Sequence, residues 1–545
     1  MIKNWNKIVI VGGGSAGWMT AATLVKFYPE KEIVVIESPN IPIVGVGEST
    51  IGGLKTWIHA LEIDEDDFMM HTDASYKMSI KFTDFYDVDS GSFYYPFGTP
   101  FTGQFGPNPP ASPEQILKLW QYKKGKNKEL PVQDYCRSYW STMPLIENNK
   151  FSKNEKGLFD GYYPETNVVY HFDATKFGAW LRDNYSKPRG VKHISAEVID
   201  INTDESGITD LVLDNGDAVT ADLYVDCTGW KSMLLNGALE VPFQSYDHIL
   251  PNNKAWAVQL PYADKEKELE PFTNCTALKH GWAWNIPLWS RLGTGYVYSD
   301  KYISPEEAKE EFKQYLMSNK MVIPRTKEEV DSLQFRDISM RIGLSEKLFV
   351  KNVVAIGLSG GFIEPLESNG LFTIHEFLLK LVDTLNRGSI SQWDKDVYNL
   401  GCKILFDGFA QFVSLHYALS HRTDSDYWKD ITKKTFQDMQ NVSQLQTSAY
   451  FELAIKKLNG GAHDLSSGMG CVGTGLNFFL YNQIDLIDNP ILNINVLDGP
   501  LNEFNKNLAQ FKLKWESEAK ASPTLYQYLK NKYDNYEIWQ ASKST

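Results

Sequence analysis

The chain lacks several features that would point to a particular class of partner. Its 545 residues include 54 lysines and arginines against 68 aspartates and glutamates, a formal net charge of −14, and no basic block stands out. This excess of negative charge opposes binding to nucleic acid or to an anionic bilayer. No apolar stretch approaches the length of a membrane span, and no cleavable signal precedes the first strand. We therefore expect a soluble, cytoplasmic protein whose ligands are small or neutral.

Cysteine is also scarce. The chain has 5 cysteines, and none of them has CxxC spacing, so neither a zinc or other metal site nor a disulfide framework is indicated. We find no internal repeat or low-complexity segment. The length, with 43% hydrophobic and 13% aromatic residues, favours a globular protein of two or more lobes. The thiols that we expect to be reduced and mostly buried are Cys136, Cys227, Cys275, Cys402 and Cys471.

The chain begins with a glycine-rich turn between a strand and a helix. The apolar residues 8–11 are followed by Gly12-Gly13-Gly14-Ser15-Ala16-Gly17. In a dinucleotide-binding loop, Gly12 would allow the tight turn, Gly14 would let backbone approach a pyrophosphate, and Gly17 would let the helix pack on its strand. The phosphates would then meet free N–H groups of Ser15 and Ala16 at the helix N-terminus. A GxGxxG motif alone is a weak signal, so its context decides.

That context includes an acidic residue at the spacing that ribose recognition needs. A second apolar run, 33–36, ends in Glu37, which lies 20 residues after Gly17. A carboxylate there accepts hydrogen bonds from the ribose hydroxyls of an adenosine, although a surface glutamate is the alternative. Its charge also argues against a 2′-phosphorylated nucleotide, which leaves FAD or NAD.

Further pieces of the nucleotide domain occur far along the chain. The apolar strand 223–226 ends in Asp226-Cys227-Thr228-Gly229, which is typical of flavoproteins. The strand 352–356 leads to Gly357, and a helix is predicted from Phe372 to Asn386. By contrast, the glycine-rich stretch that contains Gly460-Gly461 and residues 468–475 is predicted to be a loop. We expect an α/β protein with a discontinuous, Rossmann-like FAD-binding domain (1–84, 181–234 and 346–390), substrate-lobe insertions (85–180 and 235–345) and a mostly helical C-terminal part (391–545).

Five further motifs lie between residues 45 and 430. Residues 281–287 read GWAWNIP, and residues 45–50 read GVGEST, while the first loop reads GGGSAGW. Other matches lie at 171–177, 364–370 and 420–428. Together these motifs resemble those of the flavin-dependent halogenases of the tryptophan-halogenase family, whose signatures are GGGxAGW, GVGEAT and WxWxIP. The resemblance implies the fold of the flavin monooxygenases and extends from residue 8 to about 430.

The resemblance implies an oxidoreductase that uses FAD as FADH2, O2 and a halide. It implies that hypohalous acid arises at the flavin and passes through an internal tunnel to halogenate an aromatic ring. Because only one dinucleotide loop is present, electrons would come from a separate NAD(P)H-dependent flavin reductase or from a transiently bound nicotinamide. A homo-oligomer is compatible with the sequence. The resemblance assigns Gly47, Glu48 and Ser49 to the cofactor, and it assigns Trp282, Trp284, Ile286 and Pro287 to the wall between flavin and substrate. Gly357, at the end of the strand 352–356, is a further cofactor candidate.

Two residues are implied as catalytic. Lys77 matches the family's essential lysine, whose ammonium would hydrogen-bond hypohalous acid or become a haloamine, and Lys81 is the competing candidate. Alternation of apolar residues by itself predicts that Lys77 lies on the solvent-exposed face of a strand. Glu367 matches the catalytic glutamate, which would polarise the halogenating species or take the ring proton. Glu364 lies close by, but the order Glu-Ser-x-Gly selects Glu367.

The residues after Glu367 are candidates for a halide site. Ser368, Asn369 and Gly370 immediately precede a helix, so their amides would point outward and could hold a halide by charge-assisted hydrogen bonds. In the family, the first of two halide-binding amides belongs to a threonine, whereas here it belongs to Asn369. This change keeps the backbone N–H but can alter the shape of the cavity. Bromide and iodide are therefore as plausible as chloride as the halide.

The substrate is expected to be a small aromatic molecule. Residues 93–98 resemble the segment in which tryptophan halogenases carry His-Pro-Phe, but Tyr95 replaces that histidine. Tyr95 and Phe97 would still stack on a flat ring. Tyr450 and Glu452 are the nearest candidates for gripping an amino acid, and a solvated helix face explains them equally well. We therefore expect an indole, phenol or similar aromatic; the alternatives are a free-tryptophan halogenase, an FAD-dependent aromatic monooxygenase and a flavin-binding protein without turnover.

Overall fold

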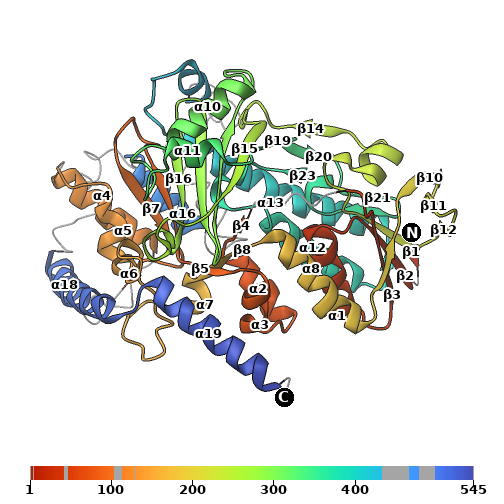
Figure 1. The fold of residues 1–545 in the computed structure, drawn as a ribbon, viewed down its shortest axis with the longest axis horizontal. Coiled ribbons are helices and arrows are strands. Elements are labelled where there is room, and N and C mark those ends of the chain that lie inside the picture. Colours follow the sequence, from red (N-terminus) through yellow and green to blue (C-terminus); the bar gives the residue numbers. More distant parts are fainter. Residues whose placement is uncertain are drawn as a thin grey trace. The chain divides into compact units, whose positions relative to one another are not determined.

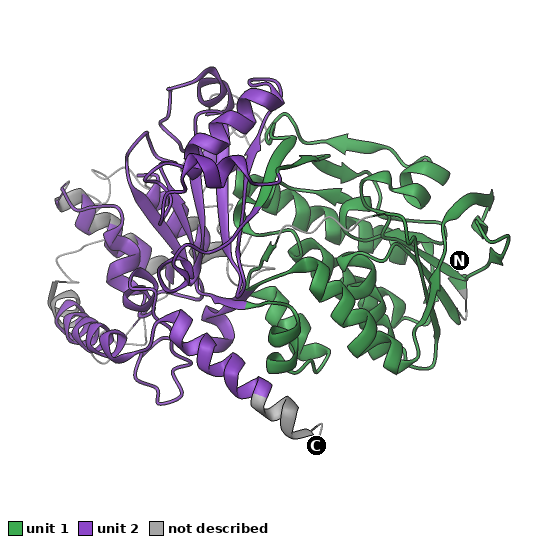
Figure 2. Ribbon diagram, viewed as in Figure 1, with its two compact units in different colours: residues 1–74, 171–258, 335–413 green, residues 75–170, 259–334, 414–545 purple. Residues whose placement is uncertain are grey.

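The computed structural model describes residues 2–3, 5–41, 47–102, 113–127, 129–432, 465–477 and 498–543. The chain divides into two compact units, each built from three separate stretches (Figure 2). Unit 1 comprises residues 1–74, 171–258 and 335–413, and unit 2 comprises residues 75–170, 259–334 and 414–545. Residues 75–84, which carry Lys77, belong to unit 2.

A six-stranded sheet forms the centre of unit 1 (Figure 1). Its strand order is β21-β22-β13-β2-β3-β9, and every neighbouring pair is parallel except β21 with β22. Strands of a parallel sheet are covered on both faces, which explains why they read as continuous apolar runs. The strands are β2 (Lys7–Val11), β3 (Glu32–Glu37), β9 (Lys192–Ser195), β13 (Leu223–Asp226), β21 (Phe349–Val350) and β22 (Val353–Ala355).

Helices pack together beside this sheet. Helix α1 (Ser15–Phe27) contacts both α8 (Ala174–Trp180) and α12 (Phe372–Leu385) (Figure 1). Helix α12 ends one residue before the predicted boundary, and Gly388 after it has a positive φ of 76°. The other elements of unit 1 are β1 (Ile2–Lys3), β4 (Glu48–Ser49), α2 (Gly53–Ala60), α3 (Glu65–His71), β12 (Ala218–Val219), β14 (Phe243–Ser245), β19 (Arg336–Ser339), β20 (Gly343–Ser345), β23 (Gly361–Phe362) and β24 (Ser389–Ile390).

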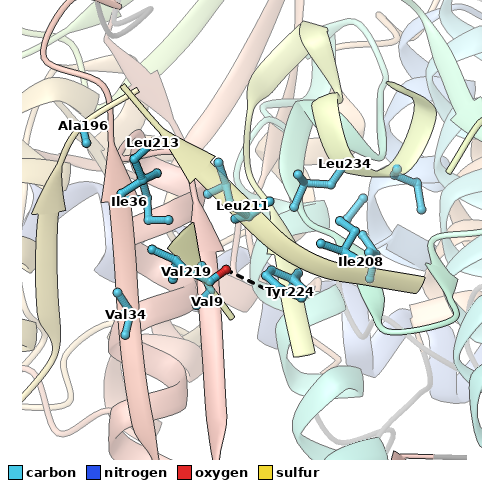
Figure 3. Packing of buried hydrophobic residues seen from close by; sticks show 14 of the residues in the cluster. Val9, Val34, Ile36, Ala196, Ile208, Leu211, Leu213, Val219, Tyr224 and Leu234 are labelled. Carbon is cyan, nitrogen blue, oxygen red and sulfur yellow. Dashed lines mark hydrogen bonds between the residues drawn. The ribbon is translucent and has the colours of Figure 1, made fainter. Parts of the chain in front are cut away.

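A hydrophobic cluster joins the parallel sheet to a small antiparallel sheet. Strands β10 (Val198–Asp204) and β11 (Gly207–Leu213) form a hairpin, and β12 extends it. Figure 3 shows Val34 and Ile36 of β3 in one cluster with Leu211 and Leu213 of β11. Burial of these branched side chains supplies hydrophobic stabilisation to this half of the unit.

The carboxylate of Asp226 organises the end of β13. It is fully buried and accepts hydrogen bonds from the N–H and hydroxyl of Thr228 (3.0 and 2.7 Å) and from the N–H groups of Leu234 and Leu235 (2.8 and 2.9 Å). Burial raises the pKa of Asp226, and these hydrogen bonds oppose that rise. The carboxylate therefore holds the turn after β13 against the helical segment Met233–Ala238.

Unit 2 contains another sheet, in which five consecutive strands have the order β18-β17-β16-β6-β7. Strands β16 and β6 are parallel, and the other neighbours are antiparallel. All residues of β16, β17 and β18 are buried, so both faces of this part of the sheet are covered. The strands are β6 (Ser79–Thr83), β7 (Ser92–Pro96), β16 (Phe272–Leu278), β17 (Gly281–Pro287) and β18 (Leu292–Tyr298).

Helices account for most of the remaining described part of unit 2. They are α4 (Pro113–Lys126), α5 (Asp134–Tyr139), α6 (Met143–Glu147), α7 (Pro164–Asn167), α9 (Lys265–Glu268), α10 (Pro305–Leu316), α11 (Lys327–Asp331), α16 (Leu465–Gly475), α18 (Asp498–Ala521) and α19 (Leu525–Lys543), beside the short strand β5 (Ser75–Lys77). Three elements cross a boundary between the units: β8 (Val169–Phe172), β15 (Lys254–Leu260) and α13 (Gln392–Ala418). Among the described residues, no helix is long and apolar enough to cross a membrane.

The prediction of a loop is wrong at residues 468–475, and its other part, Gly460-Gly461, lies outside the described residues. Helix α16 covers Leu465–Gly475, and it packs against β7. A methyl group on Gly468 would lie 2.6 Å from Cζ of Tyr95, and one on Gly475 would overlap the ring of Phe93. The glycines are there because aromatic rings lie against the helix backbone, and this tertiary contact outweighs the weak helix propensity of glycine.

We predict that Asp226→Ala lowers the free energy of unfolding by about 3 kcal/mol or more, because it leaves buried N–H groups without an acceptor. Chemical denaturation of the two proteins measures the difference. The matched control is Glu205→Ala, since Glu205 is exposed. Equal stability of Asp226→Ala and the unmodified protein would contradict the structural role of this carboxylate.

Candidate active site

The glycine loop stands at the carboxyl end of β2. Gly12 has a positive φ of 114°, and a methyl group there would overlap the carbonyl oxygen of Cys227. A methyl group on Gly17 would overlap the carbonyl oxygen of Gly12, so the first turn of α1 lies directly on this loop. In contrast, a methyl group on Gly14 would meet nothing within 4 Å. The open space therefore lies beside Gly14, where a pyrophosphate would approach.

The start of α1 leaves its backbone donors available. Gly14 is the N-cap residue and provides no side-chain cap. The first N–H groups of a helix have no partner within the helix, so those of Ser15 and Ala16 suit an anion. Gly357, with a positive φ of 77°, approaches this end of α1: a methyl group on it would lie 2.8 Å from Cβ of Ala16. These features fit the diphosphate of FAD.

Glu37 lies against the same loop. It ends β3, and its side chain packs so closely on Gly13 that a methyl group on that glycine would overlap the carboxyl group. One carboxylate oxygen, Oε2, lies 2.9 Å from Nε2 of His193 and 3.8 Å from Nη1 of Arg182. These two contacts hold Glu37 beside the glycine loop, which suits recognition of a ribose. The sequence contained no signal for His193 or Arg182.

Glu48 occupies an unusual electrostatic position. Burial raises its pKa to about 7, and the neighbouring carboxylate of Asp173 adds to that rise. Asp173 is itself held as the N-cap of α8, where it accepts hydrogen bonds from the N–H groups of Thr175 and Lys176 (2.9 and 3.0 Å). Glu48 is therefore close to half-protonated near neutral pH.

Glu48 also adjoins the candidate halide loop. A methyl group on Gly370 would lie 3.2 Å from Oε2 of Glu48, and the hydroxyl groups of Ser49 and Ser368 are 2.9 Å apart. The family motif has alanine where this chain has Ser49. The segment 48–49 thus lies against the segment 368–370, although 319 residues separate the two serines.

The candidate halide loop presents two backbone amides rather than three. The N–H of Ser368 donates to the carbonyl of Pro365 (3.0 Å), so it is already used. The N–H groups of Asn369 and Gly370 meet no acceptor in the part of the chain that the structure describes. Ser368 adopts a left-handed conformation with φ of 60°, and the side chain of Asn369 donates to the carbonyl of Ile363 (3.2 Å).

Both glutamates of this segment are buried. Glu367 ends the short 3₁₀ turn Pro365–Glu367, and it is 1% exposed. Glu364 is fully buried, and its Oε2 accepts a hydrogen bond from Nδ2 of the equally buried Asn252 (2.7 Å). In the sequence, only the order of residues in the motif distinguishes the catalytic candidate Glu367 from Glu364. The structure adds that Glu364 binds Asn252, a residue that no sequence pattern singled out.

The strand alternation around Lys77 predicts the wrong environment. Lys77 is fully buried, and the strand is interrupted at Met78, so that Ser75–Lys77 (β5) and Ser79–Thr83 (β6) are separate strands. Its ammonium lies 4.8 Å from the ring centroid of Phe97. The hydroxyl of Ser75 donates to the carbonyl of Pro287, the last residue of β17. The face that alternation predicted to be solvent-exposed is therefore buried at Lys77, where Phe97 of the same unit lies against the ammonium.

Lys81 has a different environment. Its ammonium lies 5.4 Å from the ring of Phe272 and 5.9 Å from that of Tyr94. Burial raises the pKa of the nearby Glu270 to about 7, and Lys81 opposes that rise. The side chain of Lys81 therefore partners a buried carboxyl group, whereas that of Lys77 lies against Phe97.

Trp282 and Trp284 lie on one face of β17. They are two residues apart in a strand, and their ring centroids are 6.2 Å apart. Both indole rings are buried, and neither indole N–H meets an acceptor among the residues that the structure describes. Ile286 and Pro287 complete the buried strand. The two indole N–H groups can therefore donate hydrogen bonds to a polar ligand.

Tyr95 and Phe97 form an edge-to-face pair beside Lys77. Their ring centroids are 5.7 Å apart, at an angle of 77°. Gly468 of α16 covers the ring of Tyr95, as described above. Lys77, Phe97 and Tyr95 are thus contiguous within unit 2. Tyr450 and Glu452, the candidates for gripping an amino acid, lie outside the described residues.

The chain is similar to known halogenases over most of its length. The sequence profile of the tryptophan halogenase family matches residues 7–459. The tryptophan 6-halogenase SttH of Streptomyces toxytricini is 36% identical over 453 residues, which cover 80% of this chain and 82% of the relative. The tryptophan 7-halogenase RebH of Lentzea aerocolonigenes is 32% identical over 439 residues, 78% of each chain.

The fold is also that of solved halogenase structures. Tar14, a tryptophan C-6 flavin-dependent halogenase from taromycin biosynthesis, superposes with a TM-score of 0.81 at 30% identity and covers 97% of this chain and 99% of its own. Sequence and fold agree over nearly the whole chain, including the segments that carry the glycine loop and the WxWxIP strand. The chain therefore belongs to the tryptophan halogenase family of flavin-dependent halogenases.

Proposed function

We propose that this enzyme uses FADH2, O2 and a halide to halogenate an indole, a phenol or a similar small aromatic molecule. The observation that carries this proposal is the fully buried ammonium of Lys77 against Phe97, next to Tyr95. Burying a charged amine costs free energy, and buried charged groups are concentrated at functional sites. An electrophilic halogen source and a flat ring both suit these surroundings.

FAD would be held by the features at the carboxyl edge of the unit 1 sheet. The amides of Ser15 and Ala16 would bind the diphosphate beside Gly14, and Glu37 would accept hydrogen bonds from the ribose. Reduced FAD, when bound, supplies with O2 the oxidising equivalents that convert a halide to hypohalous acid. Its electrons would come from a separate NAD(P)H-dependent flavin reductase, since the sequence contains one dinucleotide loop.

Lys77 and Glu367 would act on the halogen source and on the ring. The ammonium of Lys77 would donate a hydrogen bond to hypohalous acid delivered through the interior. Alternatively, after losing a proton, the amine would take the halogen from hypohalous acid and release water, which gives a haloamine. Trp282 and Trp284 would line its route with indole N–H groups. The carboxylate of Glu367 would take the proton that the ring loses after addition.

The halide would bind to the N–H groups of Asn369 and Gly370. Two backbone donors near the start of a helix suit an anion. Because asparagine replaces the family's threonine, we propose that bromide and iodide are accepted beside chloride.

The substrate would stack on Tyr95 and Phe97. The named relatives SttH and RebH are tryptophan halogenases. Tyr95 stands here where the family has histidine, which favours an indole or a phenol over free tryptophan as the preferred ring.

A direct assay tests this proposal. Purified protein receives FAD, a flavin reductase, NADH, one halide and a panel that contains indoles, phenols and tryptophan, and products are identified by mass spectrometry. A halogenated product is expected. Hydroxylated products would indicate an aromatic monooxygenase, and bound FAD without any product would indicate a flavin-binding protein.

We predict that Lys77→Ala lowers the rate of halogenation by about 100-fold or more, because the group that holds the halogen source is lost. Binding of FAD, followed by fluorescence, should be unchanged. The matched variant is Lys81→Ala, which should keep most of the activity. Loss of activity in Lys81→Ala with activity retained in Lys77→Ala would reverse the assignment of the two lysines.

Halide affinity should fall as the pH rises through about 7, the pKa of Glu48. Below this pH the carboxyl group is neutral, and above it a negative charge develops near Gly370 and repels the halide. The KM for bromide as a function of pH measures the effect. In Glu48→Gln the bromide KM should lose this dependence, and an unchanged profile in that variant would assign the titration to another group.

The variant Asn369→Thr restores the family's residue and should change the choice of halide. Both backbone donors remain, so activity should persist, but the side chain loses its hydrogen bond to Ile363 and reshapes the cavity. Product ratios from equal concentrations of chloride, bromide and iodide should move toward chloride by about threefold or more, a free-energy change similar to the net contribution of one hydrogen bond. An unchanged ratio would show that residue 369 does not select the halide.

A further inference from the structure

An apolar stripe runs along the solvent-facing side of α13. The side chains of Trp393, Val397, Leu400 and Ile404 are 63%, 41%, 60% and 63% exposed. Single exposed apolar residues are common on soluble proteins, but four in a row on one helix face mark an interaction surface. We call these four residues the α13 stripe, and all of them belong to unit 1.

The opposite side of the same helix segment is buried. Tyr398, Cys402 and Phe406 are 2%, 0% and 0% exposed, and the ring of Tyr398 lies 5.9 Å from that of Phe349. This part of α13 is therefore apolar on both sides. A helix with two apolar sides is stable in water when both are covered, so the stripe calls for a partner.

The spacing of the α13 stripe indicates another helix as that partner. Successive members are four, three and four residues apart. This is the alternation of d and a positions in a heptad, which forms the seam between two packed helices. Val397 and Ile404 take a positions, and Trp393 and Leu400 take d positions.

The charges beside the stripe indicate that the second helix is a copy of α13. Asp396 and Lys403 take the two g positions, seven residues apart. In an antiparallel pair, g positions of the two helices face each other, so Asp396 of each copy would meet Lys403 of the other. In a parallel pair, the g position of Asp396 would face an e position, which is Gly401, and no ion pair would form.

Both charged groups are accessible. Asp396 is exposed and accepts a hydrogen bond from Nε2 of Gln392 (3.0 Å). The side chain of Lys403 is 41% exposed, with its ammonium 3.1 Å from Oδ2 of Asp407. Neither contact withdraws these groups into the interior.

We propose that the α13 stripe is the interface of a two-fold symmetric dimer in which α13 packs antiparallel to α13 of a second copy. Val397 faces Leu400 of the second copy, and Trp393 faces its Ile404. The two-fold axis produces each contact twice, including the Asp396–Lys403 ion pair. One patch is thereby complementary to itself.

The mass in solution tests the interface. The unmodified chain should have twice its mass of 62.0 kDa by light scattering, and Leu400→Lys should shift it to the single-chain mass. Because Leu400 is exposed, the thermal unfolding of that variant should be unchanged. The matched control is Ile199→Lys, since Ile199 is 63% exposed, close to the 60% of Leu400, and lies on β10; the mass of this variant should stay doubled.

A charge exchange tests the antiparallel arrangement. Asp396→Lys and Lys403→Asp each place like charges at both contacts, so each should weaken its own dimer by about tenfold in dissociation constant. Mixing the two variants pairs opposite charges at both contacts and should restore dimers that contain one chain of each kind, detected by native mass spectrometry. A single-chain mass for the unmodified protein, a dimer that survives Leu400→Lys, or a mixture without mixed dimers would each overturn the proposal.

Discussion

The parallel hydrogen bonding of β2 with β3 and β13 is the constraint on which the candidate cofactor site depends. It aligns Val11 with Ile36 on one side and with Asp226 on the other. The chain segments that leave these strands therefore meet at one edge, although Val11 and Asp226 are far apart in sequence. The glycine loop, Glu37 and the turn after Asp226 follow from this register, because parallel strands all end on the same side.

Several ionisable side chains of the candidate site are buried. Lys77 and Glu367 are almost completely inaccessible to water, and burial brings the pKa of Glu48 to about 7. Burying a charged group costs free energy, and local hydrogen bonds offset only part of that cost. Such groups concentrate where chemistry needs them, which agrees with the family to which the chain belongs. The carboxylate of Asp226 is the structural counterpart, since it accepts hydrogen bonds from three backbone N–H groups and from the hydroxyl of Thr228.

Local sequence patterns predicted the elements that carry the nucleotide loop. The apolar runs at β2 and β3, the glycine turn and the start of α12 are confirmed, and α12 ends within one residue of its predicted end, because strand and helix periods and turn residues act over a few positions. The solvent exposure that alternation predicts for Lys77 is wrong, because alternation identifies two faces of a strand and cannot say that both are covered. The loop predicted at 468–475 is a helix for a related reason: Phe93 and Tyr95 lie against its glycines, and no local pattern records that contact.

The sequence by itself determined the fold class, the position of the glycine loop and the motifs of the family. These are local patterns, or matches that depend on residue order alone. Only the tertiary structure decided that Ser368 has already used its amide, that Ser49 meets Ser368, and that Asn252 binds Glu364. Each of these contacts joins side chains or backbone groups whose approach depends on how whole segments pack. Because packing is a property of the folded chain, only the tertiary structure shows the environment of each candidate residue.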